Sequence, residues 1–149
     1  EAERLVMGPD CTTQSVSNTA YGLAELRFVN VPIFFDLMDR RAEWLVSTGS
    51  PQCVSNLAWA CGKLGIAAPN LFAEINSHAA ALVAAGSPQD VANMSLACGR
   101  LSVTAPRLVA EMQKHAERLM KDANPHEVGI ILWGCRALMV DMPESFGVK

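Results

Sequence analysis

A block of 14 residues occurs four times along the chain, at steps of 37 or 38 residues. Its copies occupy residues 13–26, 51–64, 88–101 and 125–138. A second landmark keeps the step, because four prolines lie 37 residues apart: Pro32, Pro69, Pro106 and Pro143. Self-similarity at a period of roughly 20–50 residues is typical of solenoids, whose units stack and bury a shared core. The sequence therefore predicts an array of small stacked units.

The repeated block itself predicts a helix. A capping side chain stands just before a proline at Ser50-Pro51, Ser87-Pro88 and Asn124-Pro125, which is the usual order at a helix start. Asn124 and Glu127 also have the spacing of a capping box. Inside the helix, apolar residues recur at offsets of seven and three and so share one face. They run from Val54 through Cys61 to Leu64.

The proline column predicts the start of a second helix in each unit. Its apolar stripe in one unit comprises Leu71, Ile75, His78, Ala79 and Leu82, a spacing that predicts one continuous helix. Gly49 and Gly86 stand where these helices should end. No segment has the alternation of a strand. The expected fold is all-α, an α-solenoid of stacked helical hairpins.

We expect a single α-solenoid segment with a partial repeat at each end. The predicted boundaries are a partial repeat 1–12, repeats 13–50, 51–87 and 88–124, and a partial repeat 125–149. Solenoids usually end in polar capping units, and neither end of the sequence has one. The chain is therefore expected to be a fragment of a longer protein.

The composition limits where the protein works and what it binds. No apolar run reaches the roughly 18 residues of a membrane span, so we expect a soluble protein without membrane insertion. The five cysteines are an odd number without disulfide spacing, which favours a reducing compartment and a packing role for the column Cys61, Cys98 and Cys135. A net charge of −3 weakens the case for nucleic-acid binding, which depends on Lys and Arg.

Residues 51–65 read Pro-Gln-x-Val-x-Asn-x-Ala-Trp-Ala-Cys-Gly-Lys-Leu-Gly. With the following proline and amphipathic helix, this pattern resembles the octotricopeptide repeats of organelle proteins and the related 37-residue heptatricopeptide repeats. The resemblance is best over residues 51–64 and 88–101 and extends over nearly the whole chain. It implies an RNA-binding protein of the mitochondrial matrix or chloroplast stroma. Relatives act in organelle RNA metabolism or translation, and some are organellar ribosome components.

The candidate RNA-binding residues form columns on the face of the first helix opposite its apolar stripe. Two polar columns comprise Gln14, Gln52, Gln89 and His126, and Asn18, Asn56 and Asn93. An aromatic column comprises Tyr21, Trp59 and Trp133, and a basic one Lys63 and Arg100. Amides can pair with base edges, and rings can stack on unpaired bases. The alternative is structural: the amides tie neighbouring repeats together, and the aromatic rings fill the core.

Nothing in the sequence indicates an enzyme, a cofactor or a metal site, since phosphate-binding, nucleophile-elbow and metal motifs are absent. His78 and His115 share a column without the further ligands that zinc takes. Two functions stay open. The first is an RNA-binding helical-repeat protein acting on single-stranded organelle RNA or rRNA, with protein partners in a large assembly. The second is a protein-binding scaffold without direct RNA contact.

Overall fold

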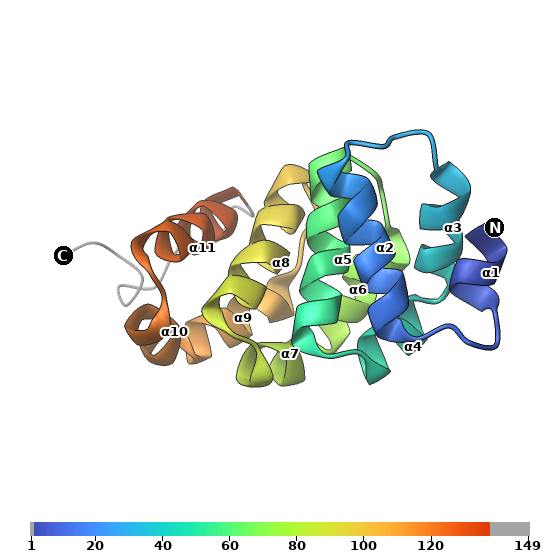
Figure 1. Ribbon diagram of the computed structural model, residues 1–149. Helices are drawn as coiled ribbons and strands as arrows, with labels where there is room; N and C mark the ends of the chain where they lie inside the picture. Colours follow the sequence, from blue (N-terminus) through green and yellow to red (C-terminus); the bar gives the residue numbers. More distant parts are fainter. Residues whose placement is uncertain (1, 138–149) are drawn as a thin grey trace.

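The computed structural model describes residues 2–137, which contain eleven helices and no strand (Figure 1). The prediction of an all-α chain is confirmed for this part. Leu138, Pro143 and the rest of the predicted partial repeat beyond residue 137 lie outside the described residues.

Four long helices lie side by side across Figure 1: α2 (Thr13–Glu25), α5 (Pro51–Leu64), α8 (Pro88–Arg100) and α11 (Pro125–Ala137). Each begins where its capping residue predicts. The Ser50 hydroxyl accepts a hydrogen bond from the N–H of Cys53, and the Ser87 hydroxyl accepts one from Asp90. The capping box of Asn124 and Glu127 is present, with bonds of 2.8 and 2.9 Å. Such caps satisfy N–H groups that have no partner inside the helix.

Three of these helices end in the same turn. The residue after the last helical turn has a positive φ at Arg27 (53°), Gly65 (66°) and Ser102 (54°). The next N–H then donates to the carbonyl five residues back, at 2.9 Å in each case. This is a Schellman motif, for which glycine is the usual residue. Arg27 and Ser102 therefore adopt a left-handed conformation that costs non-glycine residues about 1–3 kcal/mol.

The predicted second helix of each unit is wrong in one respect, because it is two helices. It begins at its proline as expected and then divides: α3 (Pro32–Arg40) and α4 (Ala42–Thr48), α6 (Pro69–Ser77) and α7 (Ala79–Ala85), α9 (Pro106–Lys114) and α10 (Ala116–Asp122). Helix α1 (Ala2–Met7) precedes them. The second halves end just before Gly49 and Gly86, where the sequence predicts the ends.

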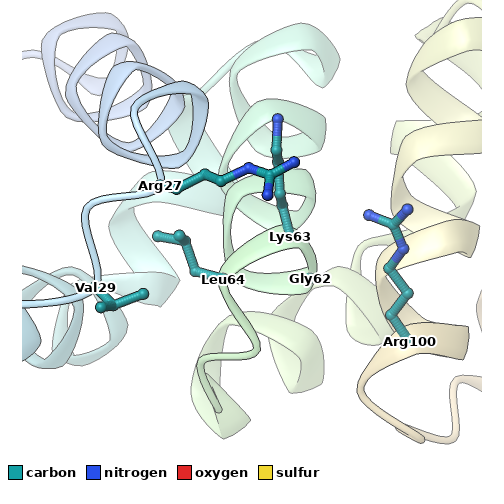
Figure 2. Close-up of a pocket in the computed structure, with 6 residues that line it drawn as sticks. All are labelled: Arg27, Val29, Gly62, Lys63, Leu64 and Arg100. Atoms are coloured by element: carbon teal, nitrogen blue, oxygen red, sulfur yellow. The ribbon is translucent and has the colours of Figure 1, made fainter.

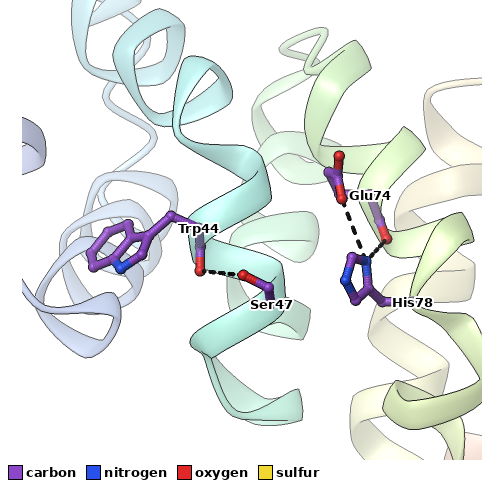
Figure 3. Close-up of polar contacts among 4 residues, drawn as sticks. All are labelled: Trp44, Ser47, Glu74 and His78. Carbon is purple, nitrogen blue, oxygen red and sulfur yellow. Dashed lines mark hydrogen bonds and ion pairs between the residues drawn. The ribbon is translucent and has the colours of Figure 1, made fainter.

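A single residue makes each bend: Arg41, His78 or His115, with φ between −97° and −101° and ψ between 14° and 16°. At His78 the ring Nδ1 lies 3.0 Å from the Glu74 carbonyl oxygen and 3.4 Å from the Glu74 carboxylate (Figure 3). Because Arg41 bends the chain without an imidazole, the ring contact accompanies the bend and does not cause it.

Packing between consecutive units explains the bend. Each second half packs on the first half of the following unit, since α1 contacts α3, α4 contacts α6 and α7 contacts α9. A buried alanine follows every bend, at Ala42, Ala79 and Ala116. A straight helix could not bury both its halves in this way. The apolar spacing runs through the bend unchanged, so the sequence pattern does not reveal it.

The divided helices α3/α4, α6/α7 and α9/α10 are here called the second layer. Side chains of one unit cap the start of the second-layer helix in the next unit. The buried Asp39 carboxylate accepts hydrogen bonds from the N–H groups of Asn70 and Leu71 at the start of α6. The Asn76 amide oxygen, 37 residues further on, accepts from Arg107 and Leu108 at the start of α9. Helices α6 and α9 have no side-chain cap of their own, so their first N–H groups depend on the preceding unit.

Arginines make the reverse connection at the other end of the second layer. Arg118 of α10 donates to the carbonyls of Val83 and Gly86, where α7 ends. Arg41 donates at 2.9 Å to the carbonyl of Val6 in α1. The last carbonyls of α1 and α7 therefore accept from the following unit.

Close approach explains two glycines inside the long helices. A Cβ at Gly62 would lie 2.9 Å from the Ala97 Cα of α8, and one at Gly134 would collide with the Ser95 side chain. Glycine at these two positions therefore lets the neighbouring helices approach closely. At Gly22, by contrast, a Cβ would meet no atom within 4 Å.

Candidate functional site

Seven of the predicted site residues line one surface hollow of about 510 Å³, here called the amide hollow. They come from α2, α5 and α8: Asn18, Tyr21, Gln52, Asn56, Trp59, Gln89 and Asn93. The columns expected from the sequence thus lie together across three neighbouring helices.

The helix starts and the contacts between helices explain this alignment. In α5, Gln52 is the second residue and is followed at offsets of four and three by Asn56 and Trp59, which places all three on one face. A serine one turn into α2 and another one turn into α5 each connect their helix to the next long helix. Ser17 Oγ donates to the Cys53 carbonyl at 3.2 Å, and Ser55 Oγ donates to Asp90 Oδ1 at 3.2 Å. The three faces are held side by side.

The amide groups of the hollow are free to bind a ligand. Within the described part of the chain, no hydrogen bond joins the side chains of Asn18, Gln52, Asn56, Gln89 or Asn93 to the protein. Their predicted alternative role, tying neighbouring units together, is performed instead by Ser17 and Ser55. Five amides from three helices therefore present donors and acceptors to the hollow.

The aromatic residues of the hollow lie at its surface. Tyr21 is 41% exposed and stacks on the half-buried Trp59, with centroids 4.9 Å apart and an interplanar angle of 25°. Lys63 Nζ lies 4.7 Å from the centroid of the Trp59 ring, within the range of a cation–π contact. Tyr21 is more exposed than Trp59 and covers its ring. The sequence predicted Tyr21 only as one member of the aromatic column and did not single it out.

A second hollow of about 420 Å³, here called the basic hollow, adjoins the first at Lys63 (Figure 2). Its lining is Arg27, Val29, Gly62, Lys63, Leu64 and Arg100. Lys63 and Arg100 were predicted, and Arg27 was missed because it lies outside the repeated block. The signal that could have found it is its place directly after Leu26, at the position that Gly65 takes in the next copy.

Among the described residues, no acidic side chain lines either hollow. The one acid in contact with a lining cation is Glu25, whose carboxylate lies 3.5 Å from Lys63 Nζ among the residues that the structure describes. The chain has a net charge of −3, so this concentration of cations is local.

The other predicted residues are exposed but line neither hollow. Gln14 and His126 are the second residues of α2 and α11, and Trp133 of α11 is 47% exposed.

The predicted packing role of Cys61 and Cys98 agrees with their surroundings, since both side chains are fully buried. Burial raises the pKa of each thiol to about 12, with a smaller effect of the Asp39 carboxylate at Cys61. The Cys135 side chain lies outside the described ones.

The described residues contain no helix that is both long and apolar enough to cross a bilayer. Within the same part of the chain, no three His, Cys, Asp or Glu side chains are grouped as metal ligands would be. Compared with known proteins, the chain matches no protein-family model and no curated protein.

Proposed function

We propose that the chain is a segment of an α-solenoid that binds single-stranded RNA across α2, α5 and α8. Its units are residues 13–50, 51–87 and 88–124, flanked by the partial repeats 1–12 and 125–149. Support comes from the helix starts at Pro51, Pro88 and Pro125, each at the same place in the sequence repeat. The resemblance of residues 51–64 and 88–101 to organelle repeats supports the mitochondrial matrix or chloroplast stroma as its location.

The observation that carries this proposal is the group of five unbonded amides beside the exposed Tyr21 ring and the half-buried Trp59 ring. Asn and Gln can each pair with an adenine edge through two hydrogen bonds, and their amides also serve other bases. Recognition of this kind requires unpaired bases, because the base edges of an RNA duplex are difficult to reach. Tyr21 offers an exposed ring on which a base can stack.

The test is to replace amides of the central helices and measure RNA affinity. The double variant Asn56→Ala, Asn93→Ala should weaken binding of a mixed-sequence single-stranded RNA by about tenfold or more, since each base contact contributes about 1–3 kcal/mol. Asn70→Ala is the matched control, because Asn70 is an exposed amide at the start of α6 in the other layer. Circular dichroism checks that both variants keep their helices.

Two results are distinct refutations. If the unmodified chain does not bind RNA, the proposed function is wrong. If it binds and the double variant binds equally well, the amide hollow is not the site.

A second candidate function, a protein-binding scaffold, is favoured by an apolar surface that meets the basic hollow at Val29. Four large apolar side chains are exposed on and beside the turn between α2 and α3: Leu26, Phe28, Val29 and Ile33. A hollow of about 340 Å³ with a mostly apolar lining adjoins them at Ile33. If this surface carries the function, Leu26→Ser with Ile33→Ser should release the protein from its native assembly, while Asn56→Ala with Asn93→Ala should not.

A further inference from the structure

We propose that the basic hollow holds phosphate groups of the bound strand, and that Glu25 competes with those phosphates for Lys63. This inference rests on the proposed RNA function. It adds the position of the strand's backbone and an acidic side chain that restrains its binding.

Three cations from three successive helices converge on this hollow. Arg27 follows α2, Lys63 lies in the last turn of α5, and Arg100 ends α8. In Figure 2, the Arg27 side chain extends from the end of α2 toward α5, and the Arg100 side chain lies on the other side of Lys63. Like charges that gather without an acidic lining favour an anionic ligand, and the spacing of the helices favours a ligand with several anionic groups.

A cation near the C-terminal end of a helix also has a purely structural explanation, because it offsets the partial negative charge of the last carbonyls. That explanation accounts for Lys63 and Arg100, which lie in the last turns. It accounts less well for Arg27, which has a φ of 53° where Gly65 has 66° in the next unit. Ser102 adopts the same conformation in the following unit, with a φ of 54°, so the turn itself requires no cation. We assign the Arg27 side chain to the phosphate site because it lines the basic hollow with Lys63 and Arg100.

The position of Lys63 connects the two hollows. Its Nζ lies 4.7 Å from the Trp59 ring, and Trp59 lines the amide hollow. A strand with its bases over the amides and rings would therefore have phosphates within reach of Lys63. The bases would lie over the middle of α2, α5 and α8, and the backbone would follow their C-terminal ends.

Glu25 is the ion-pair partner of Lys63. The pair is 3.5 Å apart, and the Lys63 and Glu25 side chains are 26% and 49% exposed. Partly exposed ion pairs of this kind are weak, so a phosphate can replace the carboxylate. Glu25 therefore lowers affinity without contacting a base.

The first experiment measures how affinity depends on salt. Two probes are used with the full chain: a mixed-sequence single-stranded RNA, and a ribose-phosphate strand of the same length without bases. The triple variant Arg27→Ala, Lys63→Ala, Arg100→Ala should lower the slope of log K against log salt concentration by about 2, since each phosphate contact on a single strand contributes about 0.7. It should also abolish binding of the strand without bases.

The matched control removes the same charge elsewhere. Arg107→Ala, Lys114→Ala, Lys121→Ala changes three exposed cations of α9 and α10, which line neither hollow. Its slope should stay within about 0.5 of the unmodified value. An equal loss of slope in both triple variants would overturn the inference, because only total charge would then matter.

The second experiment tests Glu25. Glu25→Gln should tighten RNA binding about two- to fivefold at low salt, the range expected for removing an exposed ion pair. Glu117→Gln, which removes an exposed acid of α10, should change affinity much less. The gain should disappear when Lys63→Ala is also present. An equal gain with and without Lys63 would overturn the proposed competition.

Failure of this inference can be told apart from failure of the proposed function. RNA binding that depends on Asn56 and Asn93, but with a salt slope unchanged in the triple variant, rejects the phosphate site and leaves the RNA function intact. No RNA binding by the unmodified chain rejects both.

Discussion

The carboxylate of Asp39 accepts a 2.8 Å hydrogen bond from the backbone N–H of Leu71, 32 residues later in the chain. This bond joins α3, in the second layer of one unit, to the start of its counterpart α6 in the next unit. Asn76 does the same for α9 with an amide oxygen. A carboxylate and an amide thus perform one structural task in successive units.

Replacing Asp39 should therefore show whether the start of α6 depends on the acceptor oxygen of this side chain or on its negative charge. Asp39→Ala removes a buried acceptor from two N–H groups and should lower the free energy of unfolding by about 1–3 kcal/mol. Asp39→Asn keeps an acceptor, as Asn76 does, and should cost less than half as much. Urea denaturation followed by circular dichroism measures both. Equal losses in the two variants would show that the negative charge matters more than the hydrogen bonds.

Ser102 has a φ of 54° at a turn where Gly65 has 66°. Ser102→Gly should raise the free energy of unfolding by about 0.5–1 kcal/mol, because relief of the left-handed strain exceeds the added entropy of the unfolded chain. Gly65→Ala should change stability in the opposite direction by at least as much. The comparison uses thermal unfolding at one pH, and a stabilising Gly65→Ala would contradict the account.

The long helices contain glycines in two different settings. Gly62→Ala would bring a Cβ within 2.9 Å of the Ala97 Cα and should destabilise the protein by about 1–3 kcal/mol through overpacking. At Gly22 there is no atom within 4 Å of the new Cβ, so Gly22→Ala should stabilise α2 by up to about 1 kcal/mol. Chemical denaturation of the two variants should give shifts of opposite sign.

Cys61 and Cys98 should resist modification while the protein is folded. Burial raises the pKa of each thiol to about 12, so only about one part in 10,000 is thiolate at pH 8. An alkylating reagent should label the half-buried Cys11 and Cys53 first. Mass spectrometry of briefly treated protein identifies the labelled sites, and early labelling of Cys61 would contradict the burial.

The same two thiols give the stability a dependence on alkaline pH. In the unfolded chain they ionise above their ordinary pKa of 9.0, whereas in the folded protein they stay protonated up to about 12. Their contribution is therefore fully present below pH 9 and is lost as the pH rises toward 12. The slope approaches about 1.4 kcal/mol per pH unit for each thiol. Cys61→Ala with Cys98→Ala should make the decline above pH 9 shallower.

The starts of the long helices could be predicted from the sequence because they depend on local chemistry. Ser50, Ser87 and Asn124 precede prolines at helix starts, and all three cap as expected. The bends at Arg41, His78 and His115 could not be predicted, since the apolar spacing continues through them. What bends the chain is contact with the following unit, which lies more than 20 residues away in the sequence.

The candidate site likewise combines features that the sequence predicts with features that depend on contacts between distant residues. Gln52, Asn56 and Trp59 share a face because of their spacing in one helix, and the repeat carries that face onto α2 and α8. Arg27 comes from a turn whose copies differ in length and sequence, so no column contains it. The stacking of Tyr21 on Trp59 also depends on how closely α2 and α5 pack, a distance that single residues do not encode.

Asp39 and Asn76 accept hydrogen bonds from helix starts in the following unit, whereas Arg41 and Arg118 donate to helix ends in the preceding unit. An inner unit of the second layer therefore supplies the hydrogen-bond partners of neither of its own helix ends. Helices α6 and α7 take their first acceptor from α3 and give their last carbonyls to α10. Excising them as a minimal module would thus expose both ends at once. Truncation should weaken the remaining helices in steps that reach one unit beyond each cut, and a designed shorter version would need substitute caps at both borders.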